Sequence, residues 1–265
     1  MIANILTIAG SDPSGGAGIQ ADLKTFAARG TFGMAALTAL TVQNTQGVTG
    51  VHLVPASFVA DQIESIFADV RVDAIKIGMI ATAESAEAVA DALAPHRHVP
   101  VVLDPVMVAK GGASLLARDA VEALILRLLP IATLITPNLP EAAALLGESE
   151  ARDRETMALQ ARQLMHLGPR AVLVKGGHLE GPESPDVFVY GDSVTWLEGR
   201  RSETRNTHGT GCTLASAIAA ELGKGLGPLE AVQVGKEFVS AAIARSGDLS
   251  VGKGHGPIHH FHASW

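Results

Sequence analysis

IANILTIAGSDPSGGAGIQADLKTFAARG, residues 2–30, joins three sequence patterns in succession. The apolar run 2–10 ends in a glycine and is typical of a buried strand. The loop that follows, SDPSGGAG, is rich in turn-forming residues. Residues 19–30 have helical periodicity and end at Gly30, which predicts a helix with a glycine terminus. A strand, a glycine-rich loop and a helix form the repeating unit of an α/β fold.

The same alternation continues along the chain. Further strands are predicted at residues 34–43, 74–80, 99–106, 133–138 and 171–178, and a hairpin at 186–199. Helices are predicted at residues 57–70, 84–93, 116–129, 140–147 and 227–247, and directly after Gly211. This order indicates a three-layer α/β fold whose largely parallel central sheet has helices on both faces. Residues 1–265 show neither a repeat nor a linker rich in proline or serine, so we expect a single domain.

The composition argues against several kinds of partner. The chain has a net charge of −7 and no run of like charges, which disfavours nucleic acid. It starts MIANILTIAGSD without a basic segment, and this apolar piece is too short for a membrane span. Its one cysteine, Cys212, cannot form an intramolecular disulfide. These features predict a cytoplasmic protein without a membrane partner.

Residues suited to chemistry stand where the predicted strands end. In open parallel sheets, ligands bind beyond the carboxyl ends of the strands. The residues at these ends are Gly10, Gln43, Met79, Asp104, Asn138 and Lys175. We therefore expect the functional site at this edge of the sheet.

The loop after the first strand matches neither of two familiar nucleotide motifs. Gly10 and Gly15 have the spacing of a P-loop, but Gly16 replaces its lysine. A dinucleotide fingerprint from Gly16 would need an acidic residue about twenty positions later, and none occurs between Asp22 and Asp61. The loop alone fits either a ligand-binding turn or a tight structural turn.

Three further motifs carry candidate cation and phosphate groups. Asp104 ends an apolar strand and is a candidate Mg²⁺ ligand, although a cap or turn residue is the simpler interpretation. Asn138 and Glu141 have N-x-x-E spacing, so Glu141 could orient hydrated Mg²⁺ or both residues could simply cap a helix. Lys175 precedes two glycines and could lie along nucleotide phosphates, or be a solvated lysine.

The motif HGTGC, residues 208–212, is the sharpest signal. At a helix start, the backbone N–H groups of Gly209, Thr210, Gly211 and Cys212 would stabilise a phosphate or the charge that develops in phosphoryl transfer. The same field lowers the pKa of a thiol. Two alternatives stay open: a small buried cysteine, and a covalent nucleophile with His208 as its base. The tail GHGPIHHFHASW matches no compact zinc pattern, and we expect it to shape or close the structure.

Taken in order, the motifs resemble the hydroxymethylpyrimidine/phosphomethylpyrimidine kinases of bacterial thiamine biosynthesis, in the ribokinase-like superfamily. The matching segments are AGSDPSGGAGIQADLKT, TVQNTQGV, KIGMI, VLDPVMVAKGGASLL, TPNLPEAAALL, VLVKGGH, NTHGTGCTLASAIA and GHGPIHHFH. The resemblance spans essentially the whole chain. It implies ATP-dependent phosphorylation of 4-amino-5-hydroxymethyl-2-methylpyrimidine and then of its monophosphate.

The resemblance also implies roles for individual residues. Gln43 would recognise the edge of the aminopyrimidine ring by hydrogen bonds. The pocket around the pyrimidine would be lined by Gly10, Ala17, Asp22, Met79 and Val106. Asp104 and Glu141 would govern Mg²⁺, with Asn138 nearby and Lys175 beside the ATP phosphates. The turn from Gly209 to Cys212 would be the anion hole.

This chain differs from the sugar kinases of the superfamily in the residue that accepts the proton. Sugar kinases of this superfamily have an aspartate base where this chain has Cys212, so the resemblance implies that the thiol is the general base. The resemblance also suggests a homodimer. Residues 108–116 are predicted to form a lid that closes over the substrate. A pyridoxal/pyridoxine kinase or dual-specificity enzyme is the alternative, because both substrates are flat rings with a hydroxymethyl group. A non-catalytic sensor is a further alternative, which turnover would exclude.

Overall fold

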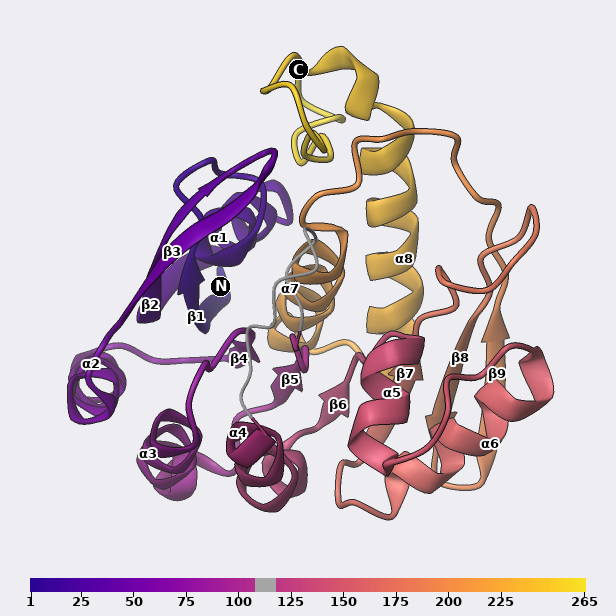
Figure 1. The fold of residues 1–265 in the computed structure, drawn as a ribbon. Helices are drawn as coiled ribbons and strands as arrows, with labels where there is room; N and C mark the ends of the chain where they lie inside the picture. Colours follow the sequence, from indigo (N-terminus) through magenta and orange to yellow (C-terminus); the bar gives the residue numbers. More distant parts are fainter. Residues whose placement is uncertain (108–117) are drawn as a thin grey trace.

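The computed structural model describes residues 1–107 and 118–265, and one sheet runs through these residues (Figure 1). Its strands are β1 (Asn4–Ser11), β2 (Phe32–Asn44), β3 (Gly47–Leu53), β4 (Ala74–Ile77), β5 (Val101–Leu103), β6 (Leu134–Ile135), β7 (Ala171–Val174), β8 (Asp186–Tyr190) and β9 (Ser193–Leu197). Their spatial order is β3-β2-β1-β4-β5-β6-β7-β8-β9. From β2 to β7 the neighbours are parallel, whereas β3, β8 and β9 pair antiparallel at the edges.

Helices cover both faces of the sheet, as Figure 1 shows. One face carries α1 (Gly18–Ala28), α7 (Thr210–Gly223) and α8 (Pro228–Ala244), and the other carries α2 (Ala56–Asp69), α3 (Ala83–Leu93), α4 (Arg118–Ala123), α5 (Leu139–Leu146) and α6 (Arg154–Met165). Side chains alternate between the two faces along each strand. In β1, Ile5 therefore packs with the α7 layer, and Leu6 and Ile8 pack with the opposite layer. The predicted three-layer α/β fold is confirmed.

Several elements are shorter than the sequence patterns predict. The strand predicted at 99–106 is reduced to β5, which lies between Pro100 and Pro105. Proline has no N–H to donate to a neighbouring strand, so it limits the ladder at both ends. In the helix predicted at 116–129, the α-helical part ends at Ala123 and continues as a π turn, Leu124–Leu128, and a 3₁₀ turn, Leu129–Ile131.

The sequence patterns predict neither β3 nor α6. β3 contains Gly47 and Gly50 and is largely exposed, so pairing with β2 orders it without an apolar signal. In α6, Gln160 occupies a buried position that an apolar residue would normally take. Its Nε2 donates to the backbone carbonyl of Ser149 at 2.8 Å, which gives the amide N–H group a partner inside the core.

The predicted lid, residues 108–116, lies outside the described residues. In the part of the chain that the structure describes, no helix combines the length and apolar character that a membrane span needs. That residues 1–265 form a single domain stays a prediction.

Candidate active site

Two carboxylates and a lysine meet at the carboxyl ends of β5 and β7. Asp104 follows β5 and Lys175 follows β7, and the Asp104 Oδ1 and Lys175 Nζ atoms are 2.9 Å apart. Glu141 belongs to the first turn of α5, and its Oε2 is 4.0 Å from the same Nζ. Because β5, β6 and β7 are neighbours in the sheet, residues distant in sequence converge at this edge.

Burial and neighbouring charge set the proton affinities in this cluster. Burial alone would raise the pKa of Asp104, but Lys175 and Lys76 hold that pKa below its ordinary value. Burial, together with the Asp104 charge, raises the pKa of Glu141 to about 7 even though Lys175 opposes the change. Burial disfavours the Lys175 cation, but Asp104 and Glu141 keep its pKa above the ordinary value. Glu141 is therefore the group that loses its proton readily when a cation binds nearby.

Asn138 holds Glu141 in place at the start of α5. The Asn138 Oδ1 accepts the backbone N–H of Glu141 at 2.8 Å, and the Glu141 Oε2 accepts the backbone N–H of Asn138 at 2.8 Å. This reciprocal pair is a capping box. The helix-cap interpretation and the site interpretation are compatible here, because the cap presents the Glu141 carboxylate to Lys175.

The first turn of α7 lies against the Asp104–Lys175 ion pair. Gly209 caps the helix in a left-handed conformation, with φ of 77°. A Cβ on Gly211 would lie 3.3 Å from the Lys175 Nζ and 3.4 Å from the Asp104 Oδ2, so the backbone approaches both groups closely. First-turn N–H groups have no acceptor within their own helix. Together with the Lys175 cation they form a site suited to phosphate oxygens.

Cys212 is half-buried in this first turn. Burial raises the pKa of its thiol to about 11, although Lys76 and the backbone N–H of Gly18 favour the thiolate. The expectation of a lowered pKa is not met, because lost hydration and the charges of Asp22 and Asp104 outweigh the groups that favour the thiolate. The thiol is therefore neutral near pH 7 in the free protein.

Asp12 organises the glycine-rich loop between β1 and α1. Its carboxylate accepts the backbone N–H groups of Ser14 at 2.9 Å, Gly16 at 3.2 Å and Ala17 at 2.9 Å. Its Oδ2 also accepts the Nε2–H of His208 at 2.8 Å. Although burial opposes the charge, these donors lower the pKa of Asp12 to about 2. One carboxylate thus shapes the loop and attaches it to the turn before α7.

Glycines allow the loop and the turn to touch. A Cβ on Gly16 would lie 2.3 Å from the Cδ2 of His208, and a Cβ on Gly209 would lie 1.8 Å from the carbonyl oxygen of Gly16. The C-terminal tail supports the turn, because the backbone N–H of His208 donates to the carbonyl of Gly256 at 3.0 Å. The tail therefore helps to shape this part of the structure, as expected.

Gln43 lies at the end of β2, beside the same turn. Its Nε2 is 3.4 Å from the Nε2 of His208, and its Oε1 accepts the hydroxyl of Thr41 at 3.1 Å. His208 is thus in contact with both Asp12 and Gln43. Gln43, the residue predicted to hydrogen-bond to the aminopyrimidine, therefore lies beside the predicted anion hole.

The other predicted pocket residues surround the glycine-rich loop or Asp104. A Cβ on Gly10 would lie 3.1 Å from the Sδ of Met79, so these two residues are in contact. Ala17 is the residue before α1, and its N–H is held by Asp12. Val106 follows Asp104 by two residues, and its N–H donates to the Asp104 carbonyl at 2.8 Å.

Asp22 lies deeper than a pocket-lining residue. It is fully buried, and its Oδ2 accepts the hydroxyl of Thr7 at 2.6 Å and the Nζ of Lys76 at 2.9 Å. Its Oδ1 accepts the hydroxyl of Ser216 at 2.7 Å. Because three protein donors already occupy the carboxylate, Asp22 supports the site from beneath.

Substitution Asp12→Asn is expected to lower the free energy of unfolding at pH 7 by about 2 kcal/mol. A carboxyl with a depressed folded pKa stabilises the fold above its unfolded pKa and loses this contribution as pH falls through the folded pKa. For Asp12 the loss runs from its ordinary pKa of 3.8 down to about 2. Urea unfolding should therefore show a smaller difference from wild type at pH 2 than at pH 7. The control is Asp192→Asn at the exposed β8–β9 turn; a pH-independent difference for Asp12→Asn would contradict this account.

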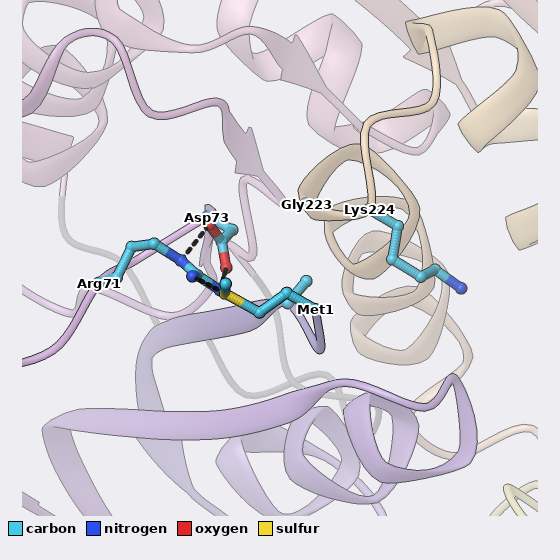
Figure 2. Close-up of a pocket in the computed structure, with 6 residues that line it drawn as sticks. Met1, Arg71, Asp73, Gly223 and Lys224 are labelled. Atoms are coloured by element: carbon cyan, nitrogen blue, oxygen red, sulfur yellow. Dashed lines mark hydrogen bonds and ion pairs between the residues drawn. The ribbon is translucent and has the colours of Figure 1, made fainter.

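A hollow of about 340 Å³ lies at the opposite edge of the sheet, where β1 and β4 begin, and Figure 2 shows the residues that line it. It is lined by Met1, Ala3, Arg71, Asp73, Gly223 and Lys224. Arg71 is already paired with Asp73, with Nε and Oδ1 2.8 Å apart, and Lys224 is paired with Glu221. The predicted site residues lie elsewhere. Buried charges with shifted pKa values mark functional sites, so the carboxyl edge is the candidate active site.

Asp12 and Lys76 contribute to the site without a predicted role in it, and His208 was predicted only as the alternative base for a covalent Cys212 nucleophile. SDPSGG does contain a signal for Asp12, because an aspartate at a turn start often accepts a nearby backbone N–H. Lys76 interrupts the apolar run AIKIGMI, and a charge in a buried strand requires a partner. His208 has no local signal for its contact with Asp12, which spans 196 residues.

Comparison with known proteins relates the chain to small-molecule kinases. The family model for phosphomethylpyrimidine kinase matches residues 12–259. The chain is 52% identical to the hydroxymethylpyrimidine/phosphomethylpyrimidine kinase of Rhizobium meliloti (strain 1021), over 100% of this chain and 99% of the relative.

Two solved structures share the fold. An ADP complex of Bacillus subtilis pyridoxal kinase superposes with a TM-score of 0.90 at 37% identity, over 99% of each chain. The phosphomethylpyrimidine kinase from Clostridium difficile 630 superposes with a TM-score of 0.81 at 41% identity, over 91% of this chain and 99% of the other.

Proposed function

This chain belongs to the phosphomethylpyrimidine kinase family, and we propose that it phosphorylates 4-amino-5-hydroxymethyl-2-methylpyrimidine with ATP and then converts the monophosphate to the diphosphate, in thiamine biosynthesis. The observation that carries the proposal is the Lys175–Asp104 pair against the first turn of α7. Phosphoryl transfer depends mainly on positioning and on positive charge of this kind. We also propose that residues 1–265 act as one kinase domain, since a single sheet joins their two halves.

In this proposal the ATP phosphates bind between Lys175 and the turn from Gly209 to Cys212. The first-turn N–H groups of α7 donate to the γ-phosphate oxygens, and Lys175 exchanges part of its contact with Asp104 for the phosphates. Gly211 matters because its missing side chain leaves the backbone open at this point. Asn138 keeps Glu141 at the rim of the same space.

Asp104 and Glu141 are the residues that would hold Mg²⁺. Among the described residues, no three His, Cys, Asp or Glu side chains gather into a complete metal cage. Two carboxylates nevertheless fit Mg²⁺, which is often bound by one or two carboxylates together with substrate phosphates. The raised pKa of Glu141 supports this assignment, because the group gains charge when a cation arrives. When bound, Mg²⁺ supplies charge neutralisation for the transferred phosphoryl group.

The pyrimidine is proposed to lie between Gln43 and the glycine-rich loop. Gln43 can both donate to and accept from the edge of an aminopyrimidine. The walls would be formed by Gly10, Ala17, Met79 and Val106. Asp22 contributes from beneath, through Lys76 and Ser216, rather than by direct contact.

Cys212 is the proposed proton acceptor. As the hydroxymethyl oxygen bonds to the γ-phosphorus, the bond to the bridging oxygen breaks and ADP leaves, while the hydroxyl proton passes to the Cys212 Sγ. The thiolate required is a minor species near pH 7, because burial raises the pKa of this thiol to about 11. Positioning and charge neutralisation therefore supply most of the acceleration.

The test of the function is ADP release with Mg·ATP, comparing the hydroxymethylpyrimidine, its monophosphate and pyridoxal at matched concentrations. We expect turnover of the first two, with pyridoxal far behind. Comparable turnover of pyridoxal would establish a dual-specificity enzyme. If none of the three compounds gives ADP release, a non-catalytic sensor would be favoured. ATP and Mg²⁺ dependence also separates phosphoryl transfer from acyl transfer, which needs neither.

One observation keeps pyridoxal kinase as the second candidate. The fold superposes at least as well on a pyridoxal kinase, with a TM-score of 0.90, as on a phosphomethylpyrimidine kinase, with 0.81. Overall shape therefore does not select the heterocycle. The identity of 52% to a hydroxymethylpyrimidine/phosphomethylpyrimidine kinase favours the pyrimidine.

We further propose a homodimer formed through the β2–β3 hairpin. This hairpin exposes Leu40 and Val42 on one face and Val51 and Leu53 on the other. Exposed apolar groups of this kind mark interaction surfaces. We also propose a cytoplasmic location, where a functional thiol stays reduced.

Substitution Val42→Glu is expected to dissociate the dimer. Val42 is 65% exposed, and burying an unpaired carboxylate in the interface would weaken association by at least about thirtyfold. Sedimentation equilibrium measures the change. Leu159→Glu, on the exposed surface of α6, is the matched control. A wild-type chain that is already monomeric at micromolar concentration would refute the proposed dimer.

A further inference from the structure

A fully buried ion pair lies beneath the first turn of α7. Lys76 on β4 and Asp22 on α1 have no exposed side-chain surface, and the Lys76 Nζ is 2.9 Å from the Asp22 Oδ2. Removing two charges from water costs several kcal/mol per ion, and apolar residues often stabilise such a position as well or better. Stability alone therefore gives a weak reason for this pair.

The position of the pair connects it to Cys212. Cys212 and Ser216 are four residues apart on α7, so they share one face of the helix. On that face, the Ser216 hydroxyl donates to the Asp22 Oδ1 at 2.7 Å. Lys76 extends along β4 towards its carboxyl end, since a Cβ on Gly78 would lie 2.6 Å from the Lys76 Nζ. The ammonium group therefore lies on the Cys212 side of α7, at the edge where the candidate site opens.

Charged groups from four elements act on Cys212 within the described residues. They are Lys76 on β4, Asp22 on α1, Asp104 after β5 and Lys175 after β7. Lys76 has the largest effect among the charges acting on the thiol, and it favours the thiolate, whereas Asp22 and Asp104 oppose it. Lys175 can be engaged by phosphates, but Lys76 has no access to solvent. Its charge therefore persists unchanged through a reaction cycle.

We infer that Lys76 is a positioning residue, whose buried charge stabilises the thiolate of Cys212 at the moment when that sulfur must accept a proton. Asp22 pairs with Lys76, and its own negative charge opposes the thiolate and so limits the effect of Lys76. The inference deepens the proposed function, because it rests on Cys212 as the proton acceptor. It also gives a reason for a charge inside an otherwise apolar strand.

Alkylation of Cys212 tests the inference without any substrate. Cys212 is the one cysteine in the chain, so iodoacetamide reports on this thiol alone. We expect Lys76→Gln to move the alkylation pH profile upward by about one unit, which is about a tenfold slower reaction below the pKa. Asp22→Asn should move the profile in the opposite direction. Lys24→Gln, an exposed lysine on α1 whose Nζ donates to the Gly15 carbonyl, is the control and should leave the profile unchanged.

The direction of the change separates the inference from a loss of structure. An exposed cysteine has a pKa of about 8.5, so partial unfolding of Lys76→Gln would move the profile downward. An unchanged or lowered profile in a folded Lys76→Gln protein, checked by circular dichroism, overturns the inference. If that variant does not fold, Asp22→Asn decides: a lowered profile in a folded protein supports the inference, and an unchanged or raised one overturns it. A wrong substrate assignment would leave these results untouched and would appear only in the ADP-release assay.

Discussion

Substitution Gly209→Ala is expected to lower kcat/KM for hydroxymethylpyrimidine phosphorylation by at least about a hundredfold. The new Cβ would lie 1.8 Å from the carbonyl oxygen of Gly16 and 2.9 Å from its carbonyl carbon. Both contacts are with backbone, so no side-chain rotation relieves them. Either the turn before α7 or the glycine-rich loop must move. A displacement of about an ångström between reacting groups is enough for this loss.

A matched glycine separates this clash from backbone strain. Gly30 has φ of 71°, close to the 77° of Gly209, but a Cβ there meets no atom within 4 Å. Gly30→Ala should therefore incur the same left-handed penalty, about 1–2 kcal/mol, and keep its activity. Urea unfolding and steady-state ADP release measure the two effects separately. Equal activity in the two alanine variants would show that contact between loop and turn is unimportant for catalysis.

The two halves of the candidate site are joined at Gly209. The proposed pyrimidine loop and the proposed phosphate turn share contacts through Gly16 and Gly209, and through the bond from His208 to Asp12. Gln43 reaches the same histidine. Binding at one half therefore constrains the position of the other, which suits a reaction that must align an attacking oxygen with phosphorus.

Much of the fold is predictable because its signals are local. The β1–α1 unit combines an apolar run, a glycine-rich loop and helical periodicity, and each of these depends only on neighbouring residues. β3 escapes prediction because pairing, not burial, holds it. α6 escapes because Gln160 is buried through a hydrogen bond that the sequence does not reveal.

The site was predictable to the extent that topology alone places residues. Parallel neighbours end at one edge, so Asp104 and Lys175 were expected to lie near each other, and their side chains are paired. The fully buried position of Asp22 depends on Thr7, Lys76 and Ser216, which come from three separate elements. The pKa of Cys212 depends first on burial and then on the charges of Lys76, Asp22 and Asp104, which lie far from it in the sequence.

Substitution Cys212→Ala is expected to slow phosphorylation of the hydroxymethyl group by about 10²–10⁴-fold, the usual contribution of a general base. Phosphorylation of the monophosphate should change little, because its attacking phosphate oxygen is largely ionised, with a second pKa of about 6. Single-turnover rates with each substrate measure the two steps. Equal losses in both steps would mean that Cys212 positions substrates and accepts no proton.

The pH dependence of the same two steps provides the sharper test of Cys212. Because burial raises the pKa of the thiol to about 11, the thiolate fraction increases tenfold per pH unit across the neutral range. The first step should therefore accelerate with pH in wild type, and the second step should not. Cys212→Asp places a carboxylate, ordinarily ionised above about pH 4, at the same position. It should restore part of the first-step rate and flatten its rise with pH, whereas an unchanged rise in this variant would assign the titration to another group.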